Sequence, residues 1–154
     1  MALFALALLI GVIAGLRTFT APAAVSWGAV LGILPLHATP LAFLAHSVTA
    51  AIFTLLALVE LYADQSPNMK SRKSTPAFAA RLISGALCGA AIGATSNALI
   101  GGIFAGLIGA AIGTLGGYEA RLRMAKRFNR DLPAAWIEDC VAVAGAVLIV
   151  LGAR

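Results

Sequence analysis

Arg17 is the side chain whose position points most directly to chemistry. It stands at a predicted helix break, because Gly15 is a weak helix former and Pro22 favours the first turn of a new helix. Thr18 and Thr20 lie beside it, and Thr20 is a candidate N-cap for the new helix. Free backbone N–H groups, a helix dipole and a guanidinium together predict an anion site. Alternatively, Arg17 extends to the polar interface or pairs with Glu60 or Asp64.

Carboxylates form the second chemical feature. Glu60 and Asp64 are four residues apart, so they share a face if one helix holds both. They could bind a cation, take part in proton movement, or act as counter-charges for the arginine at the break and for Arg81. Glu138 and Asp139 are adjacent and point in different directions, so we expect one to face the protein interior and the other an interface. The candidate site therefore comprises Arg17, Thr18, Thr20, Glu60, Asp64, Arg81, Glu138 and Asp139.

Other kinds of chemistry have no sequence signature here. A nucleophile elbow, a phosphate-binding loop and an HExxH zinc motif are all absent from the sequence. Cys88 and Cys140 lie in apolar runs without metal-ligand spacing, and His37 and His46 have no neighbouring carboxylate in the sequence. We predict that the chain is not an enzyme and holds neither a metal nor a cofactor.

The composition indicates which environment surrounds these charges. The chain is 61% hydrophobic and only 11% charged, whereas a soluble domain carries roughly 25% charged residues. So few charges cannot cover a surface that faces water. The sequence therefore predicts an integral membrane protein with one transmembrane domain over residues 1–154.

The apolar stretches predict an all-α bundle of five to six short helices rich in Gly and Ala. The first one or two elements are broken near Arg17–Pro22, so they form either two thin spans or one discontinuous element. Breaks at Gly, Pro and polar clusters divide the rest. The predicted segments are 2–16, 21–34, 41–62, 76–94, 98–118 and 133–152.

Positive charge is concentrated in two polar segments, 63–75 and 119–132. They hold eight of the 11 Lys and Arg residues, and we predict the second to be amphipathic or partly helical. Basic segments beside apolar spans usually stay in the cytoplasm. We therefore expect an inner-membrane protein with both basic loops cytoplasmic and the C-terminus outside. The bilayer is the expected partner, with anionic lipids at the basic loops; nucleic acid is not expected.

Glycines recur every four residues in the second half of the chain. At this spacing they line one helix face and allow close backbone contact. The contact could lie within one chain or form the seam of a homo-oligomer. The glycines are Gly85, Gly89, Gly93, Gly102, Gly106, Gly109, Gly113 and Gly117.

Part of the chain resembles a bacterial family of small multi-span membrane proteins that is catalogued only as a domain of unknown function. The resemblance lies in Gly15-Leu16-Arg17, in the Glu-x-x-Ala-Asp-x-x-Pro pattern of residues 60–67, and in Arg81 followed by Gly85-Ala86-Leu87. It implies a membrane fold and brings no activity with it.

Two functions fit these features. The first is transport or permeation of a small solute, ion or anionic lipid head group, with Arg17 and Arg81 as anion contacts and Glu60 and Asp64 as coupling groups. The second is a non-transporting structural or accessory subunit that binds a partner or anionic lipid. A polar cavity at the charges would favour the first function, whereas charges closed into ion pairs would favour the second.

Overall fold

The computed structural model describes residues 2–63, 75–128 and 131–154, of which 125–128 and 131–135 are described by their backbone alone. These residues form six α-helices and one short 3₁₀ helix, with no strand among them, as the predicted all-α class requires. The elements are α1 (Ala2–Leu16), α2 (Thr20–Val30), η1 (Ala42–Ala45), α3 (Ser47–Ala63), α4 (Thr75–Ala94), α5 (Leu99–Phe128) and α6 (Asp131–Gly152).

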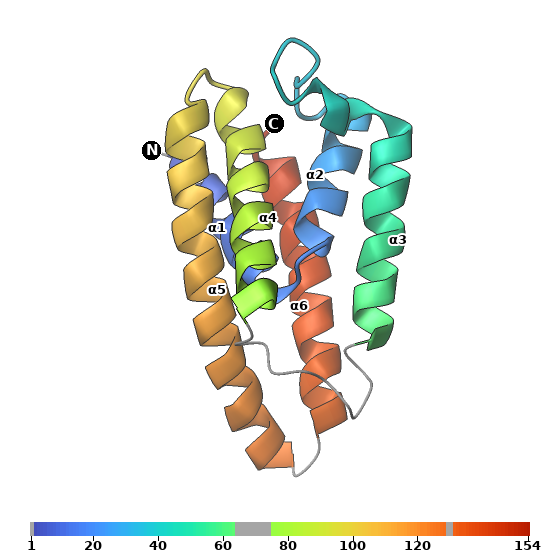
Figure 1. Cartoon of the computed structure of the whole chain (residues 1–154), viewed down its shortest axis with the longest axis vertical. Coiled ribbons are helices and arrows are strands. Elements are labelled where there is room, and N and C mark those ends of the chain that lie inside the picture. Colours follow the sequence, from blue (N-terminus) through green and yellow to red (C-terminus); the bar gives the residue numbers. More distant parts are fainter. Residues whose placement is uncertain (1, 64–74, 129–130) are drawn as a thin grey trace.

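The helices run alternately up and down, so the chain ends and connections gather at two ends of the bundle (Figure 1). The start of α1, the end of α2, the α4–α5 turn and the C-terminus lie at one end. The end of α3, the start of α4, the end of α5 and the start of α6 lie at the other. The residues that flank both basic segments are therefore at the same end.

The helix break near Arg17 is present, but the helix that follows it is shorter than predicted. The prediction that the second segment extends to residue 34 is wrong, because α2 ends at Val30 and Gly32 turns the chain with a φ of 74°. With 11 residues α2 is roughly 16 Å long, about half of a bilayer's hydrocarbon core. The following residues fold over the end of the bundle and bury Leu34, Leu36 and Leu44.

The segment 119–132 is not a loop over most of its length. Helix α5 continues through it to Phe128, because residues 119–128 contain strong helix formers and neither Gly nor Pro. At 30 residues α5 is roughly 45 Å long and exceeds the hydrocarbon thickness of a bilayer. The other basic segment, 63–75, lies outside the described residues except for its ends.

Two helices are long and apolar enough to cross a membrane: α4 over its whole length, and α5 from Leu99 to Met124. Helices α1 and α3 are apolar but shorter, with 15 and 17 residues. The described part of the chain thus supplies two candidate spans and two shorter apolar helices.

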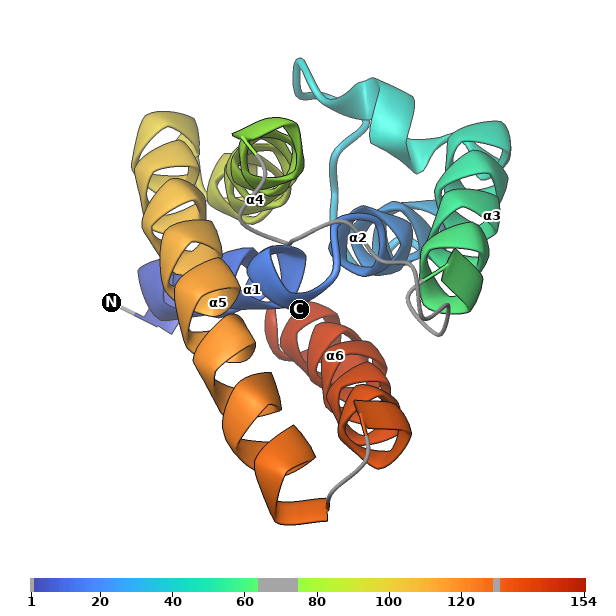
Figure 2. The same ribbon diagram turned by 60° about the horizontal axis from the view of Figure 1, so that its bottom comes forward.

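The glycines bring α1, α4 and α5 into backbone contact. A Cβ atom on Gly89 or Gly106 would collide with a backbone carbonyl oxygen across the α4–α5 contact, and one on Gly109 or Gly113 would meet a carbonyl oxygen of α1. Helix α5 thus presents glycines to both of its neighbours, and each of these contacts lies within the chain. Helix α1 also packs against α2 and α6, so it lies inside the bundle (Figure 2).

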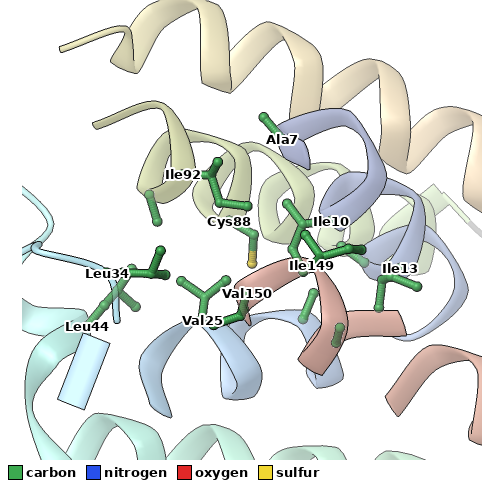
Figure 3. Close-up of a cluster of buried hydrophobic side chains, with 14 of the residues drawn as sticks. Ala7, Ile10, Ile13, Val25, Leu34, Leu44, Cys88, Ile92, Ile149 and Val150 are labelled. Atoms are coloured by element: carbon green, nitrogen blue, oxygen red, sulfur yellow. The ribbon is translucent and has the colours of Figure 1, made fainter. Parts of the chain in front are cut away.

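The apolar core lies where α1, α2, α4 and α6 meet. Figure 3 shows Ile10, Val25, Ile92 and Val150 converging from these four helices, with Cys88 among them. Cys88 is fully buried and packs there as a small apolar side chain. This core holds the four helices that carry or adjoin the charged residues in fixed positions.

Candidate functional site

The three residues 17–19 between α1 and α2 carry the centre of the site. Arg17 still closes the last turn of α1, because its N–H donates to the carbonyl oxygen of Ile13 at 2.8 Å. Its side chain is the largest fully buried one among the described residues. The guanidinium Nη2 donates to Oδ1 of Asp139 on α6 and forms an ion pair with it. The sequence predicted a carboxylate partner for Arg17 as one alternative, but it did not identify Asp139 as that partner.

Glu60 caps the start of α2 from the neighbouring helix α3. The N–H of Thr18 donates to Oε1 of Glu60 at 2.7 Å, and the N–H of Phe19 donates to Oε2 at 2.9 Å. The carboxylate therefore lies where the N–H groups and the helix dipole favour negative charge. The prediction of Thr20 as N-cap is wrong, because Phe19 holds that position without a side-chain hydrogen bond and Glu60 supplies the acceptors.

Two hydroxyl groups form hydrogen bonds with backbone carbonyl oxygens at the helix break. Ser84 Oγ donates to the carbonyl oxygen of Thr18 at 2.5 Å, and Thr114 Oγ1 lies 3.2 Å from that of Gly15. Neither Ser84 nor Thr114 was predicted as a site residue from the sequence. A Ser or Thr in an apolar helix commonly bonds to its own helix, as Thr114 also does with Ala110 at 2.8 Å, so the sequence gives little sign of a second contact.

Both carboxylates of the Glu138-Asp139 pair point into the bundle. Glu138 is buried and lies 3.7 Å from Nη1 of Arg121, which α5 supplies from its basic extension. Each carboxylate lies beside an arginine, Arg121 for Glu138 and Arg17 for Asp139, and the expectation that one of the two faces an interface stays a prediction. Helices α5 and α6 thereby add a second ion pair next to the helix break.

The remaining predicted residues divide between the site and its surroundings. Arg81 is buried on α4, one turn before Ser84. Thr20 faces a groove between α2, α3 and α6. Asp64 lies outside the described residues. Among the described residues, no three His, Cys, Asp or Glu side chains are close enough to hold a metal ion.

The sequence of the chain matches a known protein family. A family model described as a domain of unknown function (DUF4126) matches residues 4–152. The chain belongs to this family. The match extends the resemblance from roughly the first 90 residues to almost the whole chain and includes α6 with Asp139. No curated protein and no solved structure matches the chain.

The charges of this DUF4126 chain form two anion-binding positions, each occupied by one of the chain's own carboxylates. The guanidinium of Arg17 holds Asp139, and the N–H groups of Thr18 and Phe19 hold Glu60. Both positions lie within three consecutive residues. A carboxylate or phosphate of another molecule has the same hydrogen-bonding chemistry as these two side chains.

Proposed function

We propose that the chain is an integral protein of the inner membrane. The apolar faces that the helices turn outward support this location. Helix α5 has no charged residue from Leu99 to Tyr118, and its exposed side chains include Ile100, Phe104, Ile108, Ile112 and Leu115. A water-soluble monomer rarely exposes an apolar stripe of this length. The basic C-terminal turns of α5 lie on the cytoplasmic side, and the opposite end of the bundle lies outside.

Labelling of single cysteines tests this orientation. Cys140 is exposed and is first replaced by alanine, whereas Cys88 is buried and stays. In intact cells, a membrane-impermeant maleimide is expected to label His37→Cys, because His37 is exposed at the outer end. Arg123→Cys, exposed on the basic extension, is expected to react only after lysis. The reverse pattern would contradict the orientation.

The proposed activity is transport of a small anion through the helix break. The observation that carries it is the complete burial of Arg17 between two short helices, with helix-terminal N–H groups in the next two residues. A charge inside a membrane bundle costs at least about 2.5–3.5 kcal/mol, and such residues commonly mark a transport path. Discontinuous helices that point their N-terminal ends at anionic substrates occur in transporters.

In the proposed mechanism Glu60 and Asp139 occupy the anion positions while no substrate is bound. An entering anion replaces the Glu60 carboxylate at the N–H groups of Thr18 and Phe19, or the Asp139 carboxylate at Arg17. The displaced carboxylate then needs a proton or another partner. The structure with both carboxylates bound is therefore the closed state of the path.

Vesicles containing the purified protein test the activity. Loaded with chloride, inorganic phosphate or acetate, they are expected to release at least one of these anions faster than vesicles without protein. The double variant Arg17→Met/Asp139→Leu removes both charges of the pair and is expected to abolish the release. Gly116→Ala, at a helical glycine with no described atom within 4 Å of its Cβ position, serves as a matched control and is expected to retain it.

A structural or accessory role is the second candidate, and the closed pairs favour it. If Arg17, Glu60 and Asp139 only hold the broken helix together, no anion leaves the vesicles. The double variant should then fold and support the same growth as the unmodified protein. The basic turns of α5 would in that case provide the surface for anionic lipid or a partner.

A further inference from the structure

A groove between α2, α3 and α6 lies beside the two anion-binding positions of residues 17–19 and is separate from them. Its volume is about 240 Å³, and its lining consists of four residues from α2, four from α3 and three from α6. It forms because α3 packs on α2 and η1 and stands apart from α6 in the described residues (Figure 2). The half-exposed side chains of Val143 and Val147 form its α6 edge.

The groove is apolar except for three residues, and only one of them has no hydrogen-bond partner among the described residues. Trp27 Nε1 donates to Thr54 Oγ1 at 3.0 Å, and Thr54 Oγ1 donates to the carbonyl oxygen of Ala50 at 2.7 Å. Thr20 Oγ1 is buried and has no hydrogen-bond partner within the described part of the chain. Buried hydroxyl groups normally have a partner, and Thr20 lines the groove, so a molecule bound there could supply one.

We propose that the groove binds a single-chain lipid whose polar end is a neutral hydroxyl group. The chain lies along the apolar walls, and the hydroxyl group bonds to Thr20. An apolar cavity of roughly 150 Å³ in another protein stays dry and binds benzene, so a cavity of about 240 Å³ has room for part of a hydrocarbon chain.

The surroundings of Thr20 select a neutral polar end. Glu60 holds its carboxylate at the start of α2, two residues before Thr20, and repels an anionic head group. The carboxylates of Glu60 and Asp139 are already held by the N–H groups of residues 18 and 19 and by Arg17, so neither is left to bind a cationic one. A hydroxyl group needs neither charge. This inference rests on the membrane location proposed above and is independent of anion transport.

Quenching of Trp27 fluorescence tests the proposal on the whole purified protein in detergent. The chain has two tryptophans, so Trp136→Phe leaves Trp27 in the groove as the only one. The probes are a brominated dodecanol and dodecyl bromide, which lacks the hydroxyl group. Saturable quenching by the alcohol is expected. Thr20→Val removes one hydrogen bond, so it is expected to weaken the binding of the alcohol about fivefold. The binding of dodecyl bromide is expected to stay unchanged.

A variant with a larger side chain in the groove is compared with a matched variant outside it. Val147→Phe extends into the groove from a half-exposed position and is expected to remove the saturable quenching. Val141→Phe, at an exposed position of α6 outside the groove, is expected to retain it.

Three results would overturn the proposal. One is quenching that rises linearly and is identical in Val147→Phe and the parent protein, because the groove would then be ordinary lipid-facing surface. Another is an equal effect of Thr20→Val on both probes. The third is absent quenching together with a dimer in native mass spectrometry, which would place a second copy of the chain in the groove. Because Val147 is half-exposed, Val147→Phe is expected to fold. The test therefore remains decisive even if Thr20→Val does not fold.

Discussion

Replacing Arg17 with methionine is expected to lower the free energy of unfolding by about 3–5 kcal/mol. Methionine keeps much of the side chain's length and removes its charge, so the change measures the ion pair more than the packing. Asp139 would be left facing an apolar side chain in the interior, with only a small part of its side chain exposed. Unfolding in mixed detergent micelles with increasing dodecyl sulfate measures the loss.

Replacing Asp139 as well shows whether the stability lost in Arg17→Met comes from the ion pair. Arg17→Met together with Asp139→Leu is expected to recover at least half of the lost stability, because two apolar side chains can replace a buried ion pair. If the double variant is no more stable than Arg17→Met alone, Asp139 is not the group that makes Arg17 necessary. The ion pair would then be incidental to the fold.

Replacing Gly106 with alanine is expected to lower the free energy of unfolding by about 3 kcal/mol, although the change adds only one methyl group. Its Cβ would collide with the carbonyl oxygen of Gly85 and approach Cα of Gly89. These are backbone atoms and cannot rotate away as a side chain can. Helices α4 and α5 would have to separate, and α1 packs against both of them.

Gly116 on the same helix provides the control for Gly106. A Cβ at Gly116 meets no described atom within 4 Å, so Gly116→Ala is expected to add about 0.5–1 kcal/mol through its better helix propensity. Thermal unfolding in detergent compares the two variants. Equal melting of Gly106→Ala and the unmodified protein would mean that α4 and α5 do not pack through their glycines.

The position of the helix break could be predicted, whereas its partners could not. Gly15 and Pro22 have conformational preferences that act within a few residues, so the sequence contains the break directly. A buried arginine requires a carboxylate, but the sequence does not say which one. Asp139 is 122 positions away from Arg17, and only the three-dimensional packing of α6 brings them together.

Helix ends show the same division between local and distant causes. Residues 119–128 were predicted as part of a basic loop of amphipathic or partly helical character, whereas α5 continues through all of them. The cap of α2 was assigned to Thr20 because N-caps are usually local. In the fold, α3 brings Glu60 to the same N–H groups, so an acceptor distant in sequence replaces the local one.

The pairing of Arg17 with Asp139 also has a consequence for biosynthesis. Asp139 follows Arg17 by 122 positions, so the ribosome makes the arginine well before its carboxylate partner on α6. In the membrane location proposed above, the positive charge of Arg17 would have to stay near the head groups or in the insertion machinery until α6 is made. On that proposal, α1 and α2 reach their final depth only after α6 has packed against them. A fragment without α6 lacks the Asp139 carboxylate, so we expect it to be less stable in a membrane than a chain that contains α6.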